Sequence, residues 1–231
     1  MTDAKPGEKY LRPIRSFVKR EGKLTSGQQN AIELLWQTHG VDLGDELLDF
    51  SKLFGREAQT VLEIGFGNGL SLAAMAEAHP EINFFGVEVH RPGVGSLLVQ
   101  SKQRDLANIR VSQDDAVQVL EQQVMNSSLY RIQIFFPDPW HKKRHHKRRL
   151  IQTAFVETLI GKLVDGGCIH VATDWENYAE HILEVLSASD GLQNTAVDYA
   201  PKPDYRPSTK YEERGRRLGH GVWDLVFEKR S

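Results

Sequence analysis

The stretch Val61-Leu-Glu-Ile-Gly-Phe-Gly-Asn-Gly69 joins a short apolar run to a glycine-rich turn, and a helical pattern begins at Leu70. The glycines are Gly65, Gly67 and Gly69. Glycines at such a junction permit a tight turn and let the backbone approach a ligand closely. A dinucleotide fingerprint needs the spacing Gly-x-Gly-x-x-Gly, which Leu70 breaks. The stretch predicts a ligand-binding turn preceded by an acid, Glu63, although a turn that merely packs helix on strand would look similar.

Outward from this stretch, apolar runs alternate with amphipathic segments, which is typical of βαβ units and a parallel sheet. The runs are Thr60 to Ile64, Asn83 to Val89, Asn108 to Ser112, Arg131 to Phe136 and Cys168 to Thr173. The helical patterns are Leu70 to Ala78, Pro92 to Asp105, Ala116 to Val124, Arg149 to Leu163 and Trp175 to Leu186. Two more strand candidates, Leu192 to Tyr199 and Val222 to Glu228, have no helix between them and are expected to pair antiparallel. The pattern predicts an α/β fold with a three-layer, doubly wound Rossmann-like sheet of five parallel strands plus a terminal antiparallel pair.

The residues before position 60 are expected to lead into this sheet. Residues 1–24 lack periodicity and are rich in charge, which predicts a flexible basic N-terminal arm or simply an untidy terminus. Ser26 is the predicted N-cap of a helix that Gly40 closes, and residues 45–53 predict a second short helix. No repeat of 20 to 50 residues is visible, so residues 25–231 are predicted to form a single domain.

Composition excludes several classes of protein. No apolar stretch approaches the roughly 18 residues needed to cross a bilayer, so no membrane partner is expected. Cys168 is the single cysteine, which excludes an internal disulfide and a multi-cysteine zinc site and fits a cytoplasmic setting. His141 and His145 are four residues apart, but their cationic neighbours repel a dication, so no metal is expected. The net charge of -2 does not by itself indicate a polyanionic partner, so the distribution of the charges along the chain is the informative property.

Acidic residues follow the first strands of the predicted sheet. In doubly wound sheets, ligands bind beyond the carboxyl ends of the strands. Glu88 ends the second run, where a carboxylate can accept hydrogen bonds from both hydroxyls of an adenosine ribose. Asp114 and Asp115 follow the third run, where a carboxylate can meet the adenine amino group. One carboxylate for each of the first three strands, counting Glu63, is more than a packing turn requires.

The sequence Phe-Phe-Pro-Asp-Pro-Trp, residues 135 to 140, follows the fourth predicted strand. Prolines on both sides of Asp138 restrict the backbone, so the carboxylate is held at the ligand edge of the sheet. An Asp between two prolines is also a common turn residue. Its position in the expected crevice favours a functional interpretation of Asp138.

A run of cations, residues 141–149, begins in the same loop and contains no acid. The cations are Lys142, Lys143, Arg144, Lys147, Arg148 and Arg149. Such a run is often only a solvated face, but here it lies where a substrate that carries phosphates would enter, which predicts phosphate contacts. Residues 206–220 combine hydroxyl, carboxylate, aromatic and guanidinium groups, and either belong to the site or form an exposed edge loop. Asp174, directly after the fifth strand, is expected to face the same cavity.

Together these motifs resemble the bacterial tRNA (guanine-N7)-methyltransferase family. The resemblance covers roughly residues 55–231 and rests on Glu63-Ile-Gly-x-Gly-x-Gly69, Glu88-Val-His90, Phe136-Pro-Asp-Pro-Trp140 with Lys142 and Lys147-Arg-Arg149, Ala172-Thr-Asp-Trp175, and Thr209-Lys-Tyr-Glu212 with Arg214-Gly215. It implies a seven-stranded fold, S-adenosyl-L-methionine as cofactor, tRNA as partner, and methylation of N7 of the variable-loop guanine at position 46.

The resemblance also implies roles for individual residues. Beside the glycine turn of Gly65, Gly67 and Gly69, the residues expected to contact the cofactor are Glu63, Glu88, Asp115 and Asp138. Asp138 is also the expected catalytic residue. The expected substrate-binding residues are Lys142, Asp174, Thr209, Lys210, Tyr211 and Glu212. The aligned carboxylate could be Asp114 or Asp115, and the spacing to Ala116 favours Asp115.

Three other functions compete with this interpretation. A methyltransferase acting on an exocyclic amine of a nucleic-acid base would carry an Asp-Pro-Pro-aromatic turn, whereas this chain has Asp138-Pro139-Trp140, one proline short. A nicotinamide-dependent oxidoreductase would share the glycine turn and Glu88, but Leu70 stands where it would carry a glycine. A non-catalytic RNA-binding protein of the same fold would not need Asp138.

Overall fold

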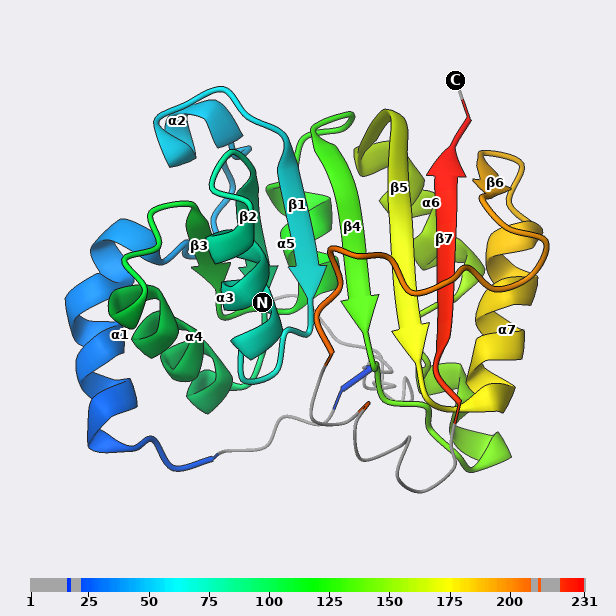
Figure 1. Cartoon of the computed structure of the whole chain (residues 1–231), viewed down its shortest axis with the longest axis horizontal. Coiled ribbons are helices and arrows are strands. Elements are labelled where there is room, and N and C mark those ends of the chain that lie inside the picture. Colours follow the sequence, from blue (N-terminus) through cyan, green and yellow to red (C-terminus); the bar gives the residue numbers. More distant parts are fainter. Residues whose placement is uncertain (1–15, 18–21, 209–211, 213–220, 231) are drawn as a thin grey trace, which may run out of the picture.

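A seven-stranded mixed sheet forms the centre of the structure, a computed structural model that describes residues 16–17, 22–208, 212 and 221–230 (Figure 1). The strands are β1 Thr60–Ile64, β2 Asn83–Val87, β3 Ile109–Ser112, β4 Leu129–Phe135, β5 Leu163–Thr173, β6 Leu192–Asn194 and β7 Trp223–Lys229. Their order is β3-β2-β1-β4-β5-β7-β6. The pairs among β1 to β5 are parallel, and β7 runs antiparallel to both β5 and β6. The predicted doubly wound sheet with a terminal antiparallel pair is confirmed.

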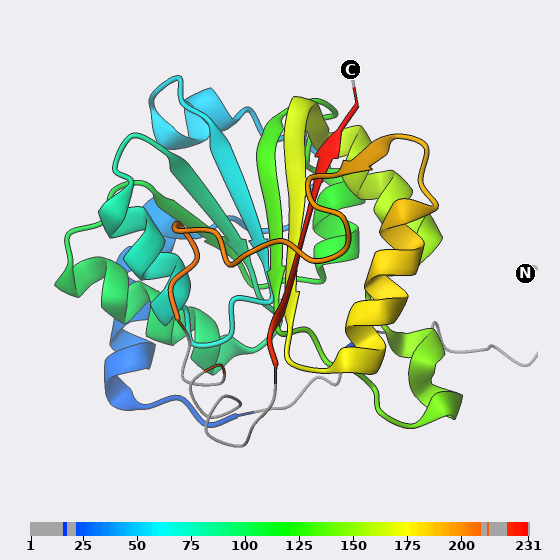
Figure 2. The same cartoon turned by 45° about the vertical axis from the view of Figure 1, so that its right-hand side comes forward.

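Helices cover both faces of this sheet (Figure 2). They are α1 Ser26–His39, α2 Phe50–Phe54, α3 Leu70–Ala78, α4 Arg91–Gln103, α5 Ala116–Gln122, α6 Thr153–Lys162 and α7 Glu176–Ser187, with a 3-10 helix, η1, at Lys143–Arg148. One apolar core joins Leu62 and Ile64 of β1 to α5, α6 and α7, and the other joins Val61 to α1, α3 and α4. Alternate residues of β1 therefore face different helix layers, as a doubly wound sheet requires. None of the described helices is long and apolar enough to span a membrane.

Several predicted boundaries need correction. Thr25, not Ser26, is the N-cap of α1, because its hydroxyl accepts the Gln28 N–H while the Gln28 side chain accepts the Thr25 N–H. The second helix begins at Phe50 because the Asp49 carboxylate caps it. The helix predicted from Arg149 starts at Thr153, and the strand predicted over 192–199 ends at Asn194. Of the predicted arm, residues 1–15 and 18–21 lie outside the described residues.

The glycine turn after β1 is pressed against α4. Gly69 has a φ of 73°, and a Cβ added there would lie 2.6 Å from the Leu97 Cβ. A Cβ added to Gly93, in the first turn of α4, would overlap the carbonyl oxygen of Gly67. The turn can therefore approach α4 this closely only because neither contact position carries a side chain. The packing of α4 thus determines where the turn sits at the edge of the sheet.

Replacing Gly93 with alanine is expected to destabilise the fold. The added methyl group must displace the backbone of the glycine turn, and overpacking of this kind costs about 1 to 3 kcal/mol. Gly27→Ala in α1 is the control, since a Cβ there meets nothing within 4 Å and is expected to leave stability unchanged or slightly higher. Urea denaturation of both variants measures the difference. Equal midpoints for Gly93→Ala and the parent protein would show that the turn is not held by this contact.

Candidate active site

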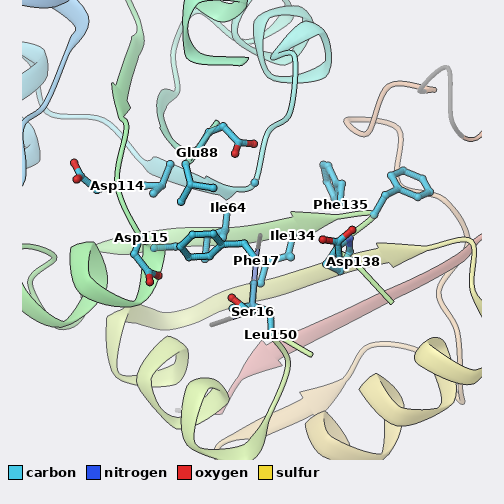
Figure 3. A pocket seen from close by; sticks show the side chains of 16 residues that line it. Ser16, Phe17, Ile64, Glu88, Asp114, Asp115, Ile134, Phe135, Asp138 and Leu150 are labelled. Carbon is cyan, nitrogen blue, oxygen red and sulfur yellow. The ribbon is translucent and has the colours of Figure 1, made fainter. Parts of the chain in front are cut away.

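A cavity of about 250 Å³ opens at the carboxyl ends of β1, β2 and β4. Ile64, Val87 and Ile134 give it apolar walls, and its carboxylates come from the segments that follow three different strands. These carboxylates belong to Glu88, Asp114, Asp115 and Asp138. Figure 3 shows Asp114 and Asp115 toward one end of the cavity and Asp138 toward the other, with Glu88 along one side. The predicted convergence of acidic residues at this edge is therefore present.

Glu88 joins the turns that follow β1 and β2. Its Oε2 accepts the N–H of Gly67 at 2.9 Å, and its Oε1 accepts the N–H of His90 at 2.9 Å. Both contacts are charge-assisted bonds to backbone donors, which fix the carboxylate at the cavity wall. A carboxylate has about four acceptor positions, so two backbone bonds leave room for hydroxyl donors of a ligand.

Both aspartates that follow β3 reach the cavity. Asp115 is the N-cap of α5, and its Oδ1 accepts the N–H of Val117 at 3.1 Å. Asp114 accepts a hydrogen bond from the Ser112 hydroxyl at 2.9 Å. The cap orients Asp115 and uses one of its oxygens, so either residue can present a carboxylate oxygen to an amino group.

The loop that carries Asp138 is held by strained and anchored aromatic residues on both sides. Phe136 and Trp140 have φ values of 52° and 48°, in the left-handed region that costs roughly 1 kcal/mol or more for a non-glycine residue. The Phe136 N–H donates to the carbonyl of Ala172 at 2.7 Å, and the Trp140 indole donates to the carbonyl of Ser16 at 3.1 Å. These anchors, together with the prolines, hold the exposed Asp138 carboxylate in one place.

Arg149 is part of this scaffold and not part of the exposed basic surface. Its side chain is only 3% exposed. It donates to the carbonyl of Pro139 at 3.1 Å and to the Asn177 side chain at 2.8 Å, and its guanidinium lies 4.7 Å from the ring centroid of Tyr178. The prediction that Arg149 contacts tRNA phosphates is wrong, because burial places it between the Asp138 loop and α7.

The rest of the basic run lies on or beside η1. Lys142, Lys143, Arg144 and Lys147 are exposed, whereas Arg148 is half-buried with its guanidinium 4.9 Å from the Trp140 ring centroid. Lys147 and Arg148 also line a second cavity of about 450 Å³ that adjoins the first, since both cavities include Ser16 and Asp115. In the part of the chain that the structure describes, no three metal-binding side chains gather in one place.

Three of the predicted cofactor residues do not line the first cavity. Among the described lining residues the glycine turn contributes Gly65, while Gly67 bonds to Glu88 and Gly69 packs on Leu97. Glu63 is 2% exposed, and its Oε2 accepts the side-chain N–H of Gln133 at 2.7 Å. In this structure Gly67 and Gly69 fix the position of the glycine turn through these contacts, whereas Glu63 is buried in the strand before the turn.

The structure describes three of the six predicted substrate-binding residues, Lys142, Asp174 and Glu212. Asp174 is half-buried at the end of β5 and is not among the described residues that line the first cavity. Glu212 is fully buried, with its carboxylate 2.8 Å from the guanidinium of Arg206. Thr209, Lys210 and Tyr211 lie outside the described residues.

Sequence reasoning missed a polar row on one face of the sheet. Glu63 of β1 pairs with Gln133 of β4, and Gln133 pairs in turn with His170 of β5. All three side chains are buried. A strand buried on both faces normally consists of apolar residues. Polar side chains at these in-register positions were therefore the signal that this face is not covered by apolar helices alone.

The first cavity fits a charged nucleoside. A Cβ added to Gly65 or Gly67 would meet no atom within 4 Å, so the turn leaves free space beside it. Glu88 suits ribose hydroxyls, Asp114 or Asp115 suits an adenine amino group, and their negative charge complements a sulfonium. This donor and acceptor set matches S-adenosyl-L-methionine. Fold and site together define a class I S-adenosylmethionine-dependent methyltransferase.

Comparison with known proteins narrows the class. A family described as "Putative methyltransferase" matches residues 57–225. The tRNA (guanine-N(7)-)-methyltransferase of Shewanella amazonensis is 60% identical over 222 residues, which are 95% of this chain and 93% of that protein. The enzyme of the same name from Aeromonas hydrophila is 57% identical over 223 residues, 96% of this chain and 94% of that protein. The chain belongs to the tRNA (guanine-N7)-methyltransferase family.

Solved structures confirm the fold. The 16S rRNA methyltransferase KamB superimposes with a TM-score of 0.58 at 13% identity, covering 80% of this chain and 95% of that one. At that identity the likeness concerns the arrangement of the sheet and helices alone.

The buried carboxyl of Glu63 makes stability depend on pH. Burial raises the pKa of Glu63 from 4.5 to about 7, so the folded protein holds this proton more tightly than the unfolded chain does. The stabilising contribution is complete below pH 4.5 and is lost as the pH rises through 7. Glu63→Gln has no such proton, so between pH 5 and 8 the parent protein should lose ~2 kcal/mol relative to this variant.

Denaturant unfolding at both pH values measures this difference. Glu46→Gln serves as the control, because Glu46 lies exposed at the surface and its replacement should shift stability about equally at pH 5 and pH 8. A difference between Glu63→Gln and the parent protein that does not change with pH would contradict the assignment.

Proposed function

We propose that this protein transfers the methyl group of S-adenosyl-L-methionine to N7 of the variable-loop guanine, position 46, of tRNA. The observation that carries the proposal is the rigidly held Asp138 at one end of a nucleoside-sized cavity whose other end presents Asp114 and Asp115. The names of its 60% and 57% identical relatives support the same substrate.

The chemistry requires orientation more than proton transfer. S-adenosyl-L-methionine supplies an electrophilic methyl group on a positively charged sulfur. N7 of guanine would bond to that methyl carbon through its in-plane lone pair while the carbon–sulfur bond breaks, and S-adenosylhomocysteine would leave with the electron pair on sulfur. N7 has no proton to lose, so the protein needs no general base. Asp138 accepts from the N1 and N2 donors of guanine and offsets the positive charge that spreads over the purine. Holding the reactants in line contributes several kcal/mol to the rate.

Access of Asp138 to those donors requires the guanine to leave its stacked position in the tRNA. Such unstacking costs a few kcal/mol, which an aromatic surface can partly offset. Trp140 is engaged by Arg148 and by Ser16. Trp175, at the start of α7, is 37% exposed. Its ring makes an edge-on contact with His141, with the two ring centroids 4.1 Å apart. Trp175 is thus the better placed of these two for a displaced base.

The proposed setting is the cytoplasm, where the single thiol of Cys168 stays reduced. Residues 25–231 are proposed to act as one methyltransferase domain, because the sheet draws strands from positions 60 to 229 into a single layer. The proposed arm, residues 1–24, reaches the site through Ser16 and Phe17, which line the cavity.

Incubation with labelled S-adenosyl-L-methionine and unmodified tRNA is expected to place one methyl group at guanine 46. Chemical cleavage specific for 7-methylguanosine then breaks the product at that nucleotide, which a methylated exocyclic amine would not allow. Asp138→Asn should lower kcat by roughly 100-fold or more, since an amide N–H replaces one acceptor oxygen. Its affinity for tRNA should stay within a few-fold of the parent value.

Label at another nucleotide, or RNA that resists the cleavage, would refute the proposed reaction. Undiminished kcat in Asp138→Asn would refute the role of that carboxylate while leaving the reaction itself intact.

The exposed cations of η1 should make tRNA binding sensitive to salt. In the double variant Lys143→Gln/Arg144→Gln, the slope of log affinity against log salt should fall by about 1.5, because each lost phosphate contact removes about 0.7 to 0.9. Lys52→Gln is the control, since Lys52 is 85% exposed on α2, far from the carboxyl ends of the strands (Figure 1). Filter binding at several salt concentrations measures the slopes. Equal slopes for the double variant and the parent protein would exclude these two residues from phosphate contact.

A further inference from the structure

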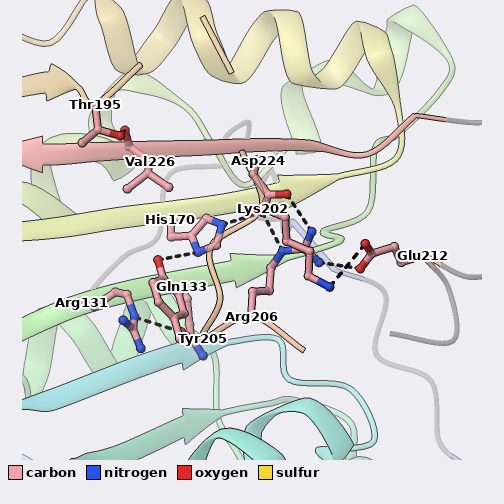
Figure 4. Close-up of polar contacts among 10 residues, drawn as sticks. All are labelled: Arg131, Gln133, His170, Thr195, Lys202, Tyr205, Arg206, Glu212, Asp224 and Val226. Carbon is pink, nitrogen blue, oxygen red and sulfur yellow. Dashed lines mark hydrogen bonds and ion pairs between the residues drawn. The ribbon is translucent and has the colours of Figure 1, made fainter. Parts of the chain in front are cut away.

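A buried arginine connects the last strand to Glu212 (Figure 4). The guanidinium of Arg206 donates from Nε and Nη2 to the two carboxylate oxygens of Asp224, at 2.6 and 2.7 Å. Its Nη1 donates to Oε2 of Glu212 at 2.8 Å. Arg206 is 1% exposed and Glu212 is fully buried. One planar cation therefore bridges two carboxylates, a geometry that the fork of arginine allows and the single ammonium of lysine does not.

His170 and Tyr205 hold Asp224 in place for this bridge. Asp224 Oδ1 is 2.8 Å from Nε2 of His170, and Nδ1 of His170 is 3.0 Å from the Tyr205 hydroxyl. Burial lowers the pKa of His170, so the imidazole is neutral, with its Nε2–H donating to Asp224 and its Nδ1 accepting from Tyr205. Among the residues that the structure describes, the charged groups at this bridge are Arg206, Asp224, Glu212 and Lys202, whose ammonium is 3.7 Å from Glu212.

These contacts continue across the sheet toward β1 and the glycine turn. The Tyr205 ring lies beneath the guanidinium of Arg131, 3.7 Å from its centroid. Arg131 donates to Gln133 at 3.3 Å, and Gln133 donates to Glu63 just before the glycine turn. Figures 1 and 2 both show the segment before residue 208 crossing the strands on this face. The segment that crosses the strands thus supplies hydrogen-bond partners to buried polar side chains of the sheet, which an apolar helix could not do.

Stability alone is a weak reason for such a bridge. Removing two carboxylates and a guanidinium from water is expensive, and apolar residues of similar volume often serve stability equally well. What the bridge does provide is a defined position for Glu212, because the bidentate contact with Asp224 leaves Arg206 little freedom to turn. Glu212 directly follows Thr209, Lys210 and Tyr211 in the chain.

We propose that Arg206 is a positioning residue, which anchors the buried Glu212 carboxylate to β7 and thereby holds the chain at the edge of the sheet where the guanosine of the tRNA substrate binds. This inference rests on the proposed methylation of tRNA and adds the residue that holds Glu212 in place for it. Asp224 acts with Arg206, since it supplies the fixed end of the bridge.

A double-mutant cycle between Arg206 and Glu212 tests the proposal. Arg206→Lys keeps the charge and loses the bridge, so kcat/KM for tRNA should fall roughly tenfold, while the dissociation constant of S-adenosylhomocysteine changes less than about twofold. In a Glu212→Gln background, the same Arg206→Lys change should cost less than about threefold, because the group that Arg206 positions is already altered.

Arg104→Lys is the matched control, because Arg104 also holds a carboxylate, that of Glu77 at 2.7 Å, but on α4 at the surface. It should leave both constants unchanged. If Arg206→Lys does not fold, Asp224→Asn takes its place in the same cycle, with the same expected dependence on Glu212.

Equal losses in both backgrounds, or weaker binding of S-adenosylhomocysteine in parallel with the loss for tRNA, would overturn the proposal by showing a general structural role. The activity of the parent protein distinguishes failure of this proposal from failure of the proposed function. If it methylates guanine 46 but the cycle shows no coupling, the inference about Arg206 alone is wrong; if it leaves tRNA unmethylated, the proposed function fails as well.

Discussion

The contact between the turns after β1 and β2 is the constraint on which the cofactor half of the molecule depends. Glu88 binds the backbone N–H groups of Gly67 and His90, and the Gly67 carbonyl lies where any side chain on Gly93 would intrude. Two strands that are separate in the chain thereby present one continuous surface. The carboxylates beyond their ends can act together because these backbone bonds hold the two turns in a defined arrangement.

Two buried arginines hold the segments that carry Asp138 and Glu212 in place, as Glu88 holds the turns after β1 and β2. Arg149 fastens the Asp138 loop to α7, and Arg206 fastens Glu212 to β7. Both act through several directed N–H bonds at once, which suits the guanidinium group and explains why neither position is filled by lysine. The exposed cations on and beside η1 are mostly lysines, and a point charge is enough for the phosphate contacts that we propose for them.

The polar row from Glu63 through Gln133 to His170 links the two halves across the sheet. It lies on the face where residues before position 208 cross the strands (Figures 1 and 2). Tyr205 of that crossing bonds to His170, and Arg206 bonds to Asp224, the other partner of His170 (Figure 4). Buried polar groups need such partners, so the path of the crossing segment and the identity of the strand residues depend on each other. This dependence gives one physical reason for placing Glu212 at the same edge as Asp138.

Local patterns in the sequence determined the order of strands and helices, the glycine turn, and the gathering of Glu88, Asp115 and Asp138 at one edge, because periodicity and topology suffice for these. Tertiary structure alone decided that Arg149 is buried while Lys143 is exposed, that Glu63 faces Gln133, and that Arg206 bridges Asp224 and Glu212. Adjacent cations look alike in a sequence. Burial and pairing depend on residues far away in the chain, and these contacts exist only once the sheet has formed.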